Sequence, residues 1–439
     1  MRARRMSTSK SRRVRASLVA PVTIHFDGEA IVAEKGEPIA AALVAAGKTA
    51  IARSPKFHRP RGPACFRAAC DGCLARVDDA PNVMTCLTPA QEGMVVTSQN
   101  KLGFGDIDLL RMTDWFFPEG MNHHELFAGV PGVQTVMQAF ARRVAGLGKL
   151  PSRVEPPRKA QRRRADVVVV GAGPAGMAIA SRLATAGRTV EVLDDQQRPG
   201  GSLRALAPSD LRAFDDIRKS FTSLVSKRQL TLKTRTVAGG LYGRDLLVVS
   251  EEEGAQIVEA RILILACGAH DGVAAFEGND LPGVMSARAA GFLLASGVLP
   301  GSKIAVVVTE GGGPFGDSFV KAVNELSLAK PPRLEVRRGV PVSTAGSSNV
   351  AKLVIERPDG KTEKLAADAV LVDAPRAPAY ELAMQAGATL VHEPRGYRVV
   401  AKRGRIAEGV FAVGEMTGIP LDAAALEHDS ERAVQTILG

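Results

Sequence analysis

Four cysteines lie close together near the N-terminal end of the chain, and their spacing restricts what this region can fold into. Cys65, Cys70 and Cys73 follow the pattern C-x4-C-x2-C, and Cys86 comes after twelve more residues. This spacing wraps one tight loop around a [2Fe–2S] cluster and brings the fourth thiolate from a neighbouring strand. Small residues between the cysteines let backbone N–H groups approach the sulfides. The pattern therefore predicts a [2Fe–2S] cluster ligated by these four thiolates.

Two alternatives to the cluster stay open. A structural zinc site usually has two short C-x2-4-C pairs, whereas this chain has one such pair. Four unrelated thiols are the other alternative, although the remaining residues contain only one more cysteine, Cys267, which we expect to be a buried structural thiol. Ala68 stands where loops of this kind usually carry glycine, so a left-handed backbone there would cost about 1 kcal/mol.

A second constraint comes from a glycine-rich turn in the middle of the chain. The β-branched run at 166–170 predicts a buried parallel strand, and Gly171-Ala172-Gly173-Pro174-Ala175-Gly176 follows it and opens a helix expected over 177–186. In such a turn the first glycine makes the bend, the second lets the backbone reach a pyrophosphate, and the third packs helix on strand. Asp194, at the end of the next strand, is placed to bond a ribose hydroxyl. The segment predicts a dinucleotide site.

Two later stretches favour FAD over NAD as the dinucleotide. Residues 262–269 predict a buried strand that ends in a small-residue turn at Gly268. Residues 410–418 place Gly414 and Glu415 just before a final helix, where a carboxylate can bond the ribityl chain of a flavin. Both stretches lie where flavoproteins with two dinucleotide folds have them. We also assign Gly201 to this site.

A second glycine motif fits a nucleotide less well. Residues 303–308 predict a strand, and Gly311, Gly313 and Gly316 follow it at G-x-G-x-x-G spacing, as in an NAD(P) domain inserted into an FAD domain. Glu310 would repel a pyrophosphate, and the next strand, 333–337, ends in arginines rather than an acid. Binding of NAD(P) and a retained Rossmann shell without a nucleotide both stay open.

These segments predict an α/β protein with an N-terminal α+β domain, because strands and helices alternate from residue 165 to the end. The N-terminal domain is expected to be ferredoxin-like (β-grasp), and the FAD domain to be of Rossmann type with a second Rossmann-like domain inserted. The expected boundaries are a disordered basic tail at 1–20, the ferredoxin-like domain at 21–105, a connecting segment and basic linker at 106–164, the FAD domain at 165–283 and 396–439, and the inserted NAD(P)-like domain at 284–395.

The net charge of +11 is concentrated in two segments. Residues 1–20 carry seven basic and no acidic residues, and residues 151–164 carry six basic residues and one acidic residue, so the rest of the chain is close to neutral. Nucleic-acid binding needs a basic face on a folded domain, with aromatic residues where strands are single, and aromatics make up only 4% here. We therefore expect no nucleic-acid partner. A targeting peptide is the alternative to a disordered tail.

The same composition bears on membranes and compartment. No uninterrupted apolar run approaches the ~18 residues of a membrane span, so we expect no transmembrane segment. Five cysteines are too few for a disulfide scaffold in a chain of 439 residues. A reducing compartment, the cytoplasm, is expected.

With these residues in view, the chain resembles the alpha subunit of heterotetrameric sarcosine oxidase and related opine, hydroxyproline or proline dehydrogenase and hydrogen cyanide synthase complexes. The stretches 53–62, 145–148 and 276–285 carry this resemblance. It implies a partner beta subunit, similar to D-amino-acid oxidase, whose own flavin oxidises an amine. Sarcosine oxidase alpha subunits usually lack the cluster cysteines, which this chain keeps. We expect no folate chemistry, because the C-terminal folate-binding domain of that subunit has no counterpart in the 439 residues.

The function expected first is an FAD- and [2Fe–2S]-containing electron-transfer subunit of an amino-acid or secondary-amine dehydrogenase or oxidase. A self-sufficient NAD(P)H-dependent flavoprotein reductase is the first alternative, and a catalytically silent subunit that holds nucleotides for assembly is the second. No catalytic residue can be named. We expect His123 and His124 to be packing or surface residues, and His270 and Asp271 to bond within their turn or to handle protons.

Overall fold

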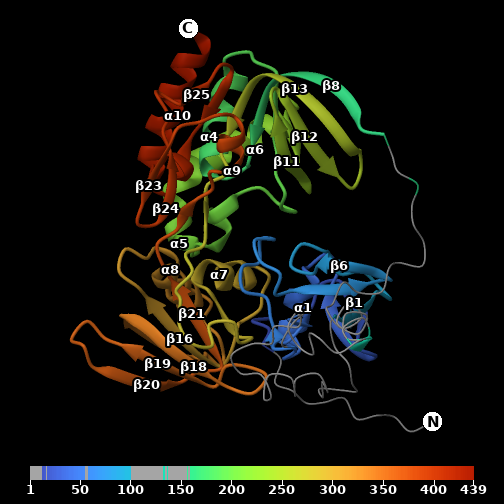
Figure 1. Ribbon diagram of the computed structural model, residues 1–439, viewed down its shortest axis with the longest axis vertical. Coiled ribbons are helices and arrows are strands. Elements are labelled where there is room, and N and C mark those ends of the chain that lie inside the picture. The colour runs from blue at the N-terminus through green and yellow to red at the C-terminus, as the bar shows by residue number, and fades with distance from the viewer. Residues whose placement is uncertain are drawn as a thin grey trace. The chain divides into compact units, whose positions relative to one another are not determined.

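The computed structural model describes residues 12–15, 17–54, 58–99, 132, 133, 136, 156 and 159–439 (Figure 1). Its contacts divide the chain into two compact units. The first unit combines residues 1–154 with 274–309 and 326–373, and the second combines 155–273, 310–325 and 374–439. His123, His124 and the stretch 145–148 lie outside the described residues.

Residues 17–54 and 58–99 of the first unit form a five-stranded sheet, one helix and a separate short pair of strands, β3 and β4. The sheet order is β2-β1-β7-β5-β6, with β1 antiparallel to β2 and parallel to β7. Side chains alternate along β1, so that Ile24 is fully buried and His25 is exposed. Every residue of the Ala-rich helix α1 is buried. The elements are β1 (Pro21–Phe26), β2 (Glu29–Glu34), α1 (Ile39–Ala45), β3 (Ala52–Arg53), β4 (Pro60–Arg61), β5 (Leu74–Val77), β6 (Ala80–Met84) and β7 (Val95–Ser98). The ferredoxin-like fold predicted for this region is confirmed.

The end of the basic tail differs from the expectation of disorder. Residues 12–15 and 17–20 are described, and Val14 N donates to Gly297 O at 2.9 Å. Leu299 N donates to Arg12 O at 2.8 Å, and the Arg13 guanidinium pairs with Glu37 at 2.6 Å. These hydrogen bonds satisfy backbone N–H and C=O groups that would otherwise bond to water, so this part of the tail is ordered within the first unit.

The remainder of the first unit contains a parallel sheet and an antiparallel one. The parallel sheet has the order β15-β21-β16-β17, and its central strands are buried almost throughout, as their continuous apolar runs predict. The antiparallel sheet has the order β18-β19-β20. The elements are β15 (Val284–Ser286), α7 (Ala287–Ala295), β16 (Lys303–Val308), β17 (Arg333–Arg338), β18 (Val340–Ala345), β19 (Lys352–Glu356), β20 (Thr362–Ala366) and β21 (Ala369–Asp373).

The second unit is built on a mixed sheet. Strands β10, β9, β8, β13 and β26 run parallel, and β12 and β11 continue from β13 as an antiparallel extension. Its buried core joins residues of β8, β12 and β13, and helix α4 packs against both α6 and α10 (Figure 1).

The strands of this unit are β8 (Gln161–Val170), β9 (Val190–Leu193), β10 (Thr231–Lys233), β11 (Thr236–Tyr242), β12 (Asp245–Ser250), β13 (Gly254–Leu265), β14 (Ala269–His270), β22 (Ala377–Pro378), β23 (Leu390–Glu393), β24 (Gly396–Val399), β25 (Arg405–Ala407) and β26 (Val410–Ala412). The α-helices are α4 (Pro174–Thr185), α5 (Pro208–Leu211), α6 (Asp215–Ser226), α8 (Phe315–Glu325), α9 (Glu381–Gln385) and α10 (Ala423–Leu438). The 3-10 helices are η2 (Gly201–Ala205), η3 (Arg212–Phe214) and η4 (Gly414–Thr417).

Two expected boundaries differ from the structure. Strand β8 begins at Gln161, so three arginines expected in a linker belong to it. Each pairs with an acid on another strand: Arg162 with Asp245, Arg163 with Glu191 and Arg164 with Glu259. The inserted part of the first unit runs from 274 to 373 without 310–325, rather than from 284 to 395. None of the helices among the described residues is long and apolar enough to cross a membrane.

Candidate functional site

The four clustered cysteines meet in one loop and the strand end beside it. Cys65, Cys70 and Cys73 lie on the loop between β4 and β5, and Cys86 follows β6. The sulfur of Cys65 is within hydrogen-bonding reach of Cys70 and Cys86, and Cys73 is within reach of Cys86. The loop is fixed to the strand by Thr85, whose Oγ1 donates to Cys73 O at 2.7 Å. All four predicted ligands are therefore brought together.

The environment of these thiols favours two of them as anions. Hydrogen bonds from Cys70 and Cys86 lower the pKa of Cys65 to about 2, and Ala69 N donates to the same sulfur at 3.3 Å. A hydrogen bond from Cys86 lowers the pKa of Cys73. The donors Cys70 and Cys86 have raised pKa values for the same reason. Thiolates are the form that ligates iron.

The backbone of the loop fits a group held close to it. Phe66 and Ala68 have φ of +51° and +59°, so the loop folds back on itself in the left-handed region. A side chain on Gly72 would overlap the carbonyl oxygen of Gly62, which shows how closely the loop packs. Among the described residues, no group of three or more His, Cys, Asp or Glu side chains is arranged to hold a metal ion. The role of the four cysteines as ligands stays a prediction.

The cysteine loop packs on the stretch that precedes α7. Ser286 N donates to Ala64 O at 3.1 Å, next to Cys65. Arg61 pairs with Asp280, and the Cα position of Gly62 is so close to Pro282 that an added Cβ would lie 3.1 Å from the proline Cβ. Arg61 and Gly62 of one stretch that carries the family resemblance thus contact Asp280 and Pro282 of another within the first unit.

The first glycine turn has the geometry of a dinucleotide cradle. Gly171 has φ of +102°, and a Cβ there would lie 2.5 Å from Ala266 O at the end of β13. A Cβ on Gly176 would overlap Gly171 O, so helix α4 packs directly on the turn. Gly173, by contrast, has no neighbour within 4 Å of its added Cβ except Gly201 Cα at 4.0 Å. The middle glycine therefore faces open space at the N-terminus of α4, where a pyrophosphate is favoured.

The other glycines predicted for this site surround the turn. Gly201 has φ of +50°, and its added Cβ would lie 2.9 Å from Gly173 Cα. Gly414 lies close to the first turn of α4, where its added Cβ would be 2.6 Å from the Cβ of Ala175. An added Cβ on Gly268 would lie 3.8 Å from Glu415 Oε2. The structure therefore places the predicted dinucleotide residues, including Pro174 as first residue of α4, around one turn.

Asp194 is buried beneath the turn and ties it to the next strand. Its Oδ2 accepts from Ala172 N at 2.6 Å, and its Oδ1 accepts from Gln196 N at 2.9 Å. Burial raises the pKa of this carboxyl to about 6, with the nearby Asp195 adding to the effect and the two backbone N–H groups opposing it. Each oxygen keeps a further lone pair, so a bond to a ribose hydroxyl stays a prediction.

Glu415, predicted to bond the ribityl chain of a flavin, is half of an ion pair. Its Oε1 lies 2.7 Å from Nη2 of Arg376, and the two side chains are 12% and 13% exposed. The neighbouring Gly414 N donates to Asp429 Oδ2 at 2.9 Å, and burial raises the pKa of Asp429. Arg376 and Asp429 are the site residues that sequence reasoning missed, because no local motif marks either of them.

The second glycine motif differs from the first. Gly311 and Gly313 have φ of +68° and +123°, and no described atom lies within 4 Å of an added Cβ on Gly313. Gly316 is in the first turn of α8. Arg337, at the end of β17, pairs with Glu363 at 2.8 Å and Glu335 at 2.9 Å, so its guanidinium is held by acids. A nucleotide at this motif stays a prediction.

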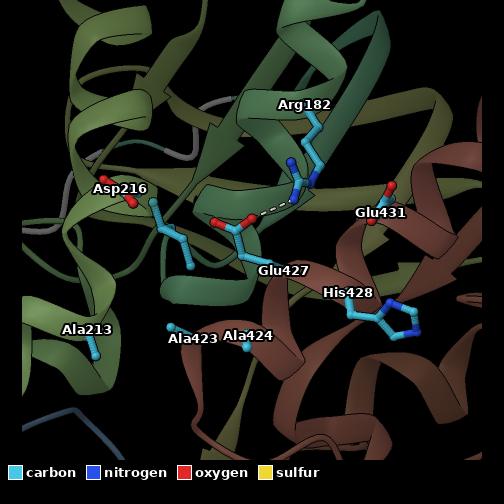
Figure 2. A pocket seen from close by; sticks show the side chains of 9 residues that line it. Arg182, Ala213, Asp216, Ala423, Ala424, Glu427, His428 and Glu431 are labelled. Atoms are coloured by element: carbon cyan, nitrogen blue, oxygen red, sulfur yellow. Dashed lines mark hydrogen bonds and ion pairs between the residues drawn. The ribbon is translucent and has the colours of Figure 1, made fainter.

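Two further features lie apart from the predicted residues. His270, expected to bond within its turn or to handle protons, instead has its Nε2 2.8 Å from Glu381 Oε1 of helix α9, and both side chains are partly exposed. A pocket of 380 Å³ lies between α4, α6 and α10, where Arg182 pairs with Glu427 beside Asp216, His428 and Glu431 (Figure 2). None of the residues predicted for cofactor binding lines this pocket. Cys267 is half-buried, not fully buried as expected.

Two family models match the regions that hold these sites. Residues 19–101 match a 2Fe-2S iron-sulfur cluster binding domain, and residues 169–215 match an NAD(P)-binding Rossmann-like domain. The chain is 29% identical over 404 residues to sarcosine oxidase subunit alpha of Rhizobium meliloti, which covers 84% of this chain. The resemblance to the sarcosine oxidase alpha subunits is confirmed.

Further comparisons limit and extend this similarity. The alignment spans 41% of the Rhizobium subunit, so this chain matches less than half of that relative's length. Hydrogen cyanide synthase subunit HcnB of Pseudomonas aeruginosa is 34% identical over 159 residues, which is 34% of this chain and 33% of the relative. The structure of L-proline dehydrogenase from P. horikoshii shares the fold, with a TM-score of 0.72 at 21% identity over 97% of this chain and 75% of that one. Together the matches support the two cofactors predicted from the sequence, FAD and a [2Fe–2S] cluster.

Proposed function

We propose that the chain is the FAD- and [2Fe–2S]-containing electron-transfer subunit of a secondary-amine or amino-acid dehydrogenase or oxidase. The observation that carries this proposal is the presence of two candidate cofactor sites in one chain. One is a loop and a strand end that bring the four predicted cysteine ligands together, and the other is a glycine turn with the predicted dinucleotide residues around it. The similarity to sarcosine oxidase alpha subunits over most of the chain supports the amine as substrate class.

Each of the two candidate sites would hold one cofactor. Cys65, Cys70, Cys73 and Cys86 would hold the cluster, and backbone N–H groups such as that of Ala69 would stabilise its negative charge. The turn at Gly173 and the N-terminus of α4 would bind the pyrophosphate of FAD. Bound FAD supplies the ability to take up two electrons together and to release them singly.

The partner that supplies the electrons is proposed from the relatives. Several of the matching proteins are named as subunits, which indicates a multi-subunit complex. We infer a beta subunit similar to D-amino-acid oxidase, with its own flavin and the amine site. The free cluster thiols favour a reducing compartment, and we propose the cytoplasm.

The test begins with the cofactors of the purified full chain. We expect about two irons, two labile sulfides and one FAD per chain, the first two fixed by the cluster type. Cys70→Ser should lose the iron and sulfide and keep the flavin, because the two candidate sites are in different units of the chain. Protein with one zinc and no iron would refute the cluster, and flavin loss in this variant would refute the independence of the sites.

The electron donor is tested by stopped-flow absorbance. The flavin should bleach rapidly when the complex with its beta subunit is mixed with the amine substrate. Rapid bleaching of the isolated chain by NADPH would instead establish the reductase alternative. A chain that contains nucleotide but no flavin would establish the silent assembly subunit.

A further inference from the structure

The segment between β21 and β22 brings a largely buried arginine side chain to the predicted dinucleotide site. Arg376 lies just before β22, which pairs with β14 immediately after Gly268. Its Nη2 contacts Glu415 Oε1 at 2.7 Å, and its guanidinium carbon lies 4.8 Å from the centre of the Phe315 ring. Phe315 is 1% exposed. The guanidinium is therefore held on one edge by a carboxylate and on one face by an aromatic ring.

The donors of this guanidinium are not all used. Nη1 of Arg376 is buried and has no hydrogen-bond partner among the described residues. A buried charged donor without a partner is costly, so such a group in a folded protein calls for an explanation. Arginine presents its donors in a rigid planar fork, so fixing Nη2 on Glu415 also fixes the direction of Nη1.

The location of the pair indicates which part of a dinucleotide it would meet. Glu415 Oε2 lies 3.8 Å from where a Cβ on Gly268 would stand, and Gly414 approaches Ala175 of the glycine turn. Asp194, by contrast, bonds to Ala172 on the strand side of the same turn. The adenosine half of a dinucleotide belongs on the side of Asp194. The pair of Arg376 and Glu415 would therefore meet the other half of FAD, which carries the ribityl chain.

We propose that Arg376 is a cofactor-binding residue that positions Glu415 through Nη2 and donates from Nη1 to an oxygen of the ribityl half of FAD. The inference rests on the proposed function, because it takes FAD as the dinucleotide. It also gives the second glycine motif a role that needs no second nucleotide. Phe315, which follows Gly313 and Pro314 in that motif, supports the arginine of the first site.

The test compares two ligands on the full-length chain after removal of its flavin. FAD and ADP share the adenosine and phosphate contacts, but only FAD has the ribityl half. In Arg376→Gln we expect the dissociation constant for FAD, measured by calorimetric titration, to rise about 10- to 100-fold, as for loss of hydrogen bonds to a charged group. The constant for ADP should stay within about twofold of the wild type. Arg376→Lys keeps the charge without the fork and should give an intermediate loss.

Arg188→Gln is the matched control. Arg188 also forms a largely buried ion pair in the same unit, 2.8 Å from Asp166, which lies in the middle of strand β8, five residues before Gly171 of the glycine turn. This variant should bind FAD and ADP as the wild type does, even if its melting temperature falls.

The outcomes separate this inference from the proposed function. Unchanged FAD affinity in Arg376→Gln overturns the inference and leaves the function intact. An equal loss of FAD and ADP affinity, with a lower melting temperature of the ligand-free protein, shows that Arg376 only supports the fold and also overturns it. If Arg376→Gln does not fold, the same comparison is made with Arg376→Lys, where equal FAD affinity is the refuting result. Wild-type protein that binds ADP but not FAD overturns the proposed cofactor and the inference with it.

Discussion

The two glycine motifs of this chain share a pattern but differ in what surrounds them. At the first, neighbouring segments converge on the turn, with Gly201 and Gly414 close to it and Asp194 bonded to its backbone. At the second, an added Cβ on the middle glycine, Gly313, also meets open space, but among the described residues the atom near the turn is Pro375 Cγ, 3.4 Å from an added Cβ on Gly311. The spacing G-x-G-x-x-G therefore specifies a strand–turn–helix bend, whereas a ligand site also needs partners from elsewhere in the chain.

The helix after the second turn is bound to other residues of its own unit. Ser318 Oγ accepts from Ala207 N at 2.7 Å and donates to Asp210 Oδ2 at 2.7 Å. Lys321 pairs with the same aspartate at 2.6 Å. These contacts fix α8 against α5 and η2, so the second motif serves the packing of the unit that holds the first.

The largest effect is expected from side chains placed at the two middle glycines. Gly173→Val should abolish FAD binding, because the open space in front of the turn is filled while the fold has room for a Cβ. Gly313→Ala should keep full flavin content and lose about 1–2 kcal/mol of stability, since its φ of +123° suits only glycine. Flavin content and thermal unfolding of the two variants decide the comparison. Equal flavin loss in both would show that the motifs act alike.

A smaller effect concerns nicotinamide nucleotides at the second motif. NADPH and NADH alone should reduce the flavin slowly or not at all, because the exposed Glu310 precedes the turn and Arg337 is held by two glutamates. Glu310→Gln removes the repulsion and should tighten NADPH binding by about tenfold or less if a site exists, as one charge in a solvated setting is worth on the order of 1 kcal/mol. Micromolar NADPH binding by the wild type would place a working nucleotide site at the second motif.

The acid of the first motif should leave a signature in the pH dependence of stability. Asp194 has a pKa raised from 3.8 to about 6 by burial, so the folded state binds its proton more tightly than the unfolded state does. Its contribution therefore favours folding below pH 3.8 and is lost as the pH rises to about 6. Between pH 4 and 6.5, the ligand-free wild type should lose about 1–3 kcal/mol relative to Asp194→Asn, as followed by urea unfolding. A constant difference across this range would mean that Asp194 titrates normally.

The smallest effect is expected at an alanine whose backbone, like that of a glycine in the first turn, is in the left-handed region. Gly171 of the first turn has φ of +102°, whereas Ala68 of the cysteine loop has φ of +59° with a methyl group in place. Ala68→Gly should raise the free energy of unfolding of the cluster-loaded chain by up to about 1 kcal/mol. Ala69→Gly is the control, because Ala69 has no positive φ and should lose stability. A loss in both variants would show that the strain at Ala68 is relieved elsewhere.

The sequence predicted the elements best where the pattern is local. The strand at Lys303–Val308 was predicted with its observed bounds, and the glycine turn between β8 and α4 was placed correctly, because a buried apolar run followed by glycines has few other solutions. The start of β8 was predicted too late. Its arginines read as a linker, since the acids that pair with them lie 28 to 95 positions further along the chain.

In the candidate site, too, the sequence predicted the residues that a local motif marks and missed those that distant parts of the chain supply. The cysteines and glycines that the sequence singled out do come together, although their roles as ligands stay predictions. Arg376 escaped notice because it stands in a connecting segment without a motif, and Asp429 because it lies on an ordinary helix. Such residues become visible only when the fold brings them to Glu415 and Gly414.

The contact between the cysteine loop and residues 280–286 has a consequence for how the chain is made. The loop leaves the ribosome about 200 residues before the segment that covers it, a delay on the order of 10 to 40 seconds at ordinary rates of synthesis. During that interval Cys65 and its neighbours have no covering segment, and iron and sulfide can be delivered to them. Once Ser286 bonds to Ala64, the loop is held against residues 280–286. The order of synthesis thus gives the biogenesis machinery an early window for loading the cluster.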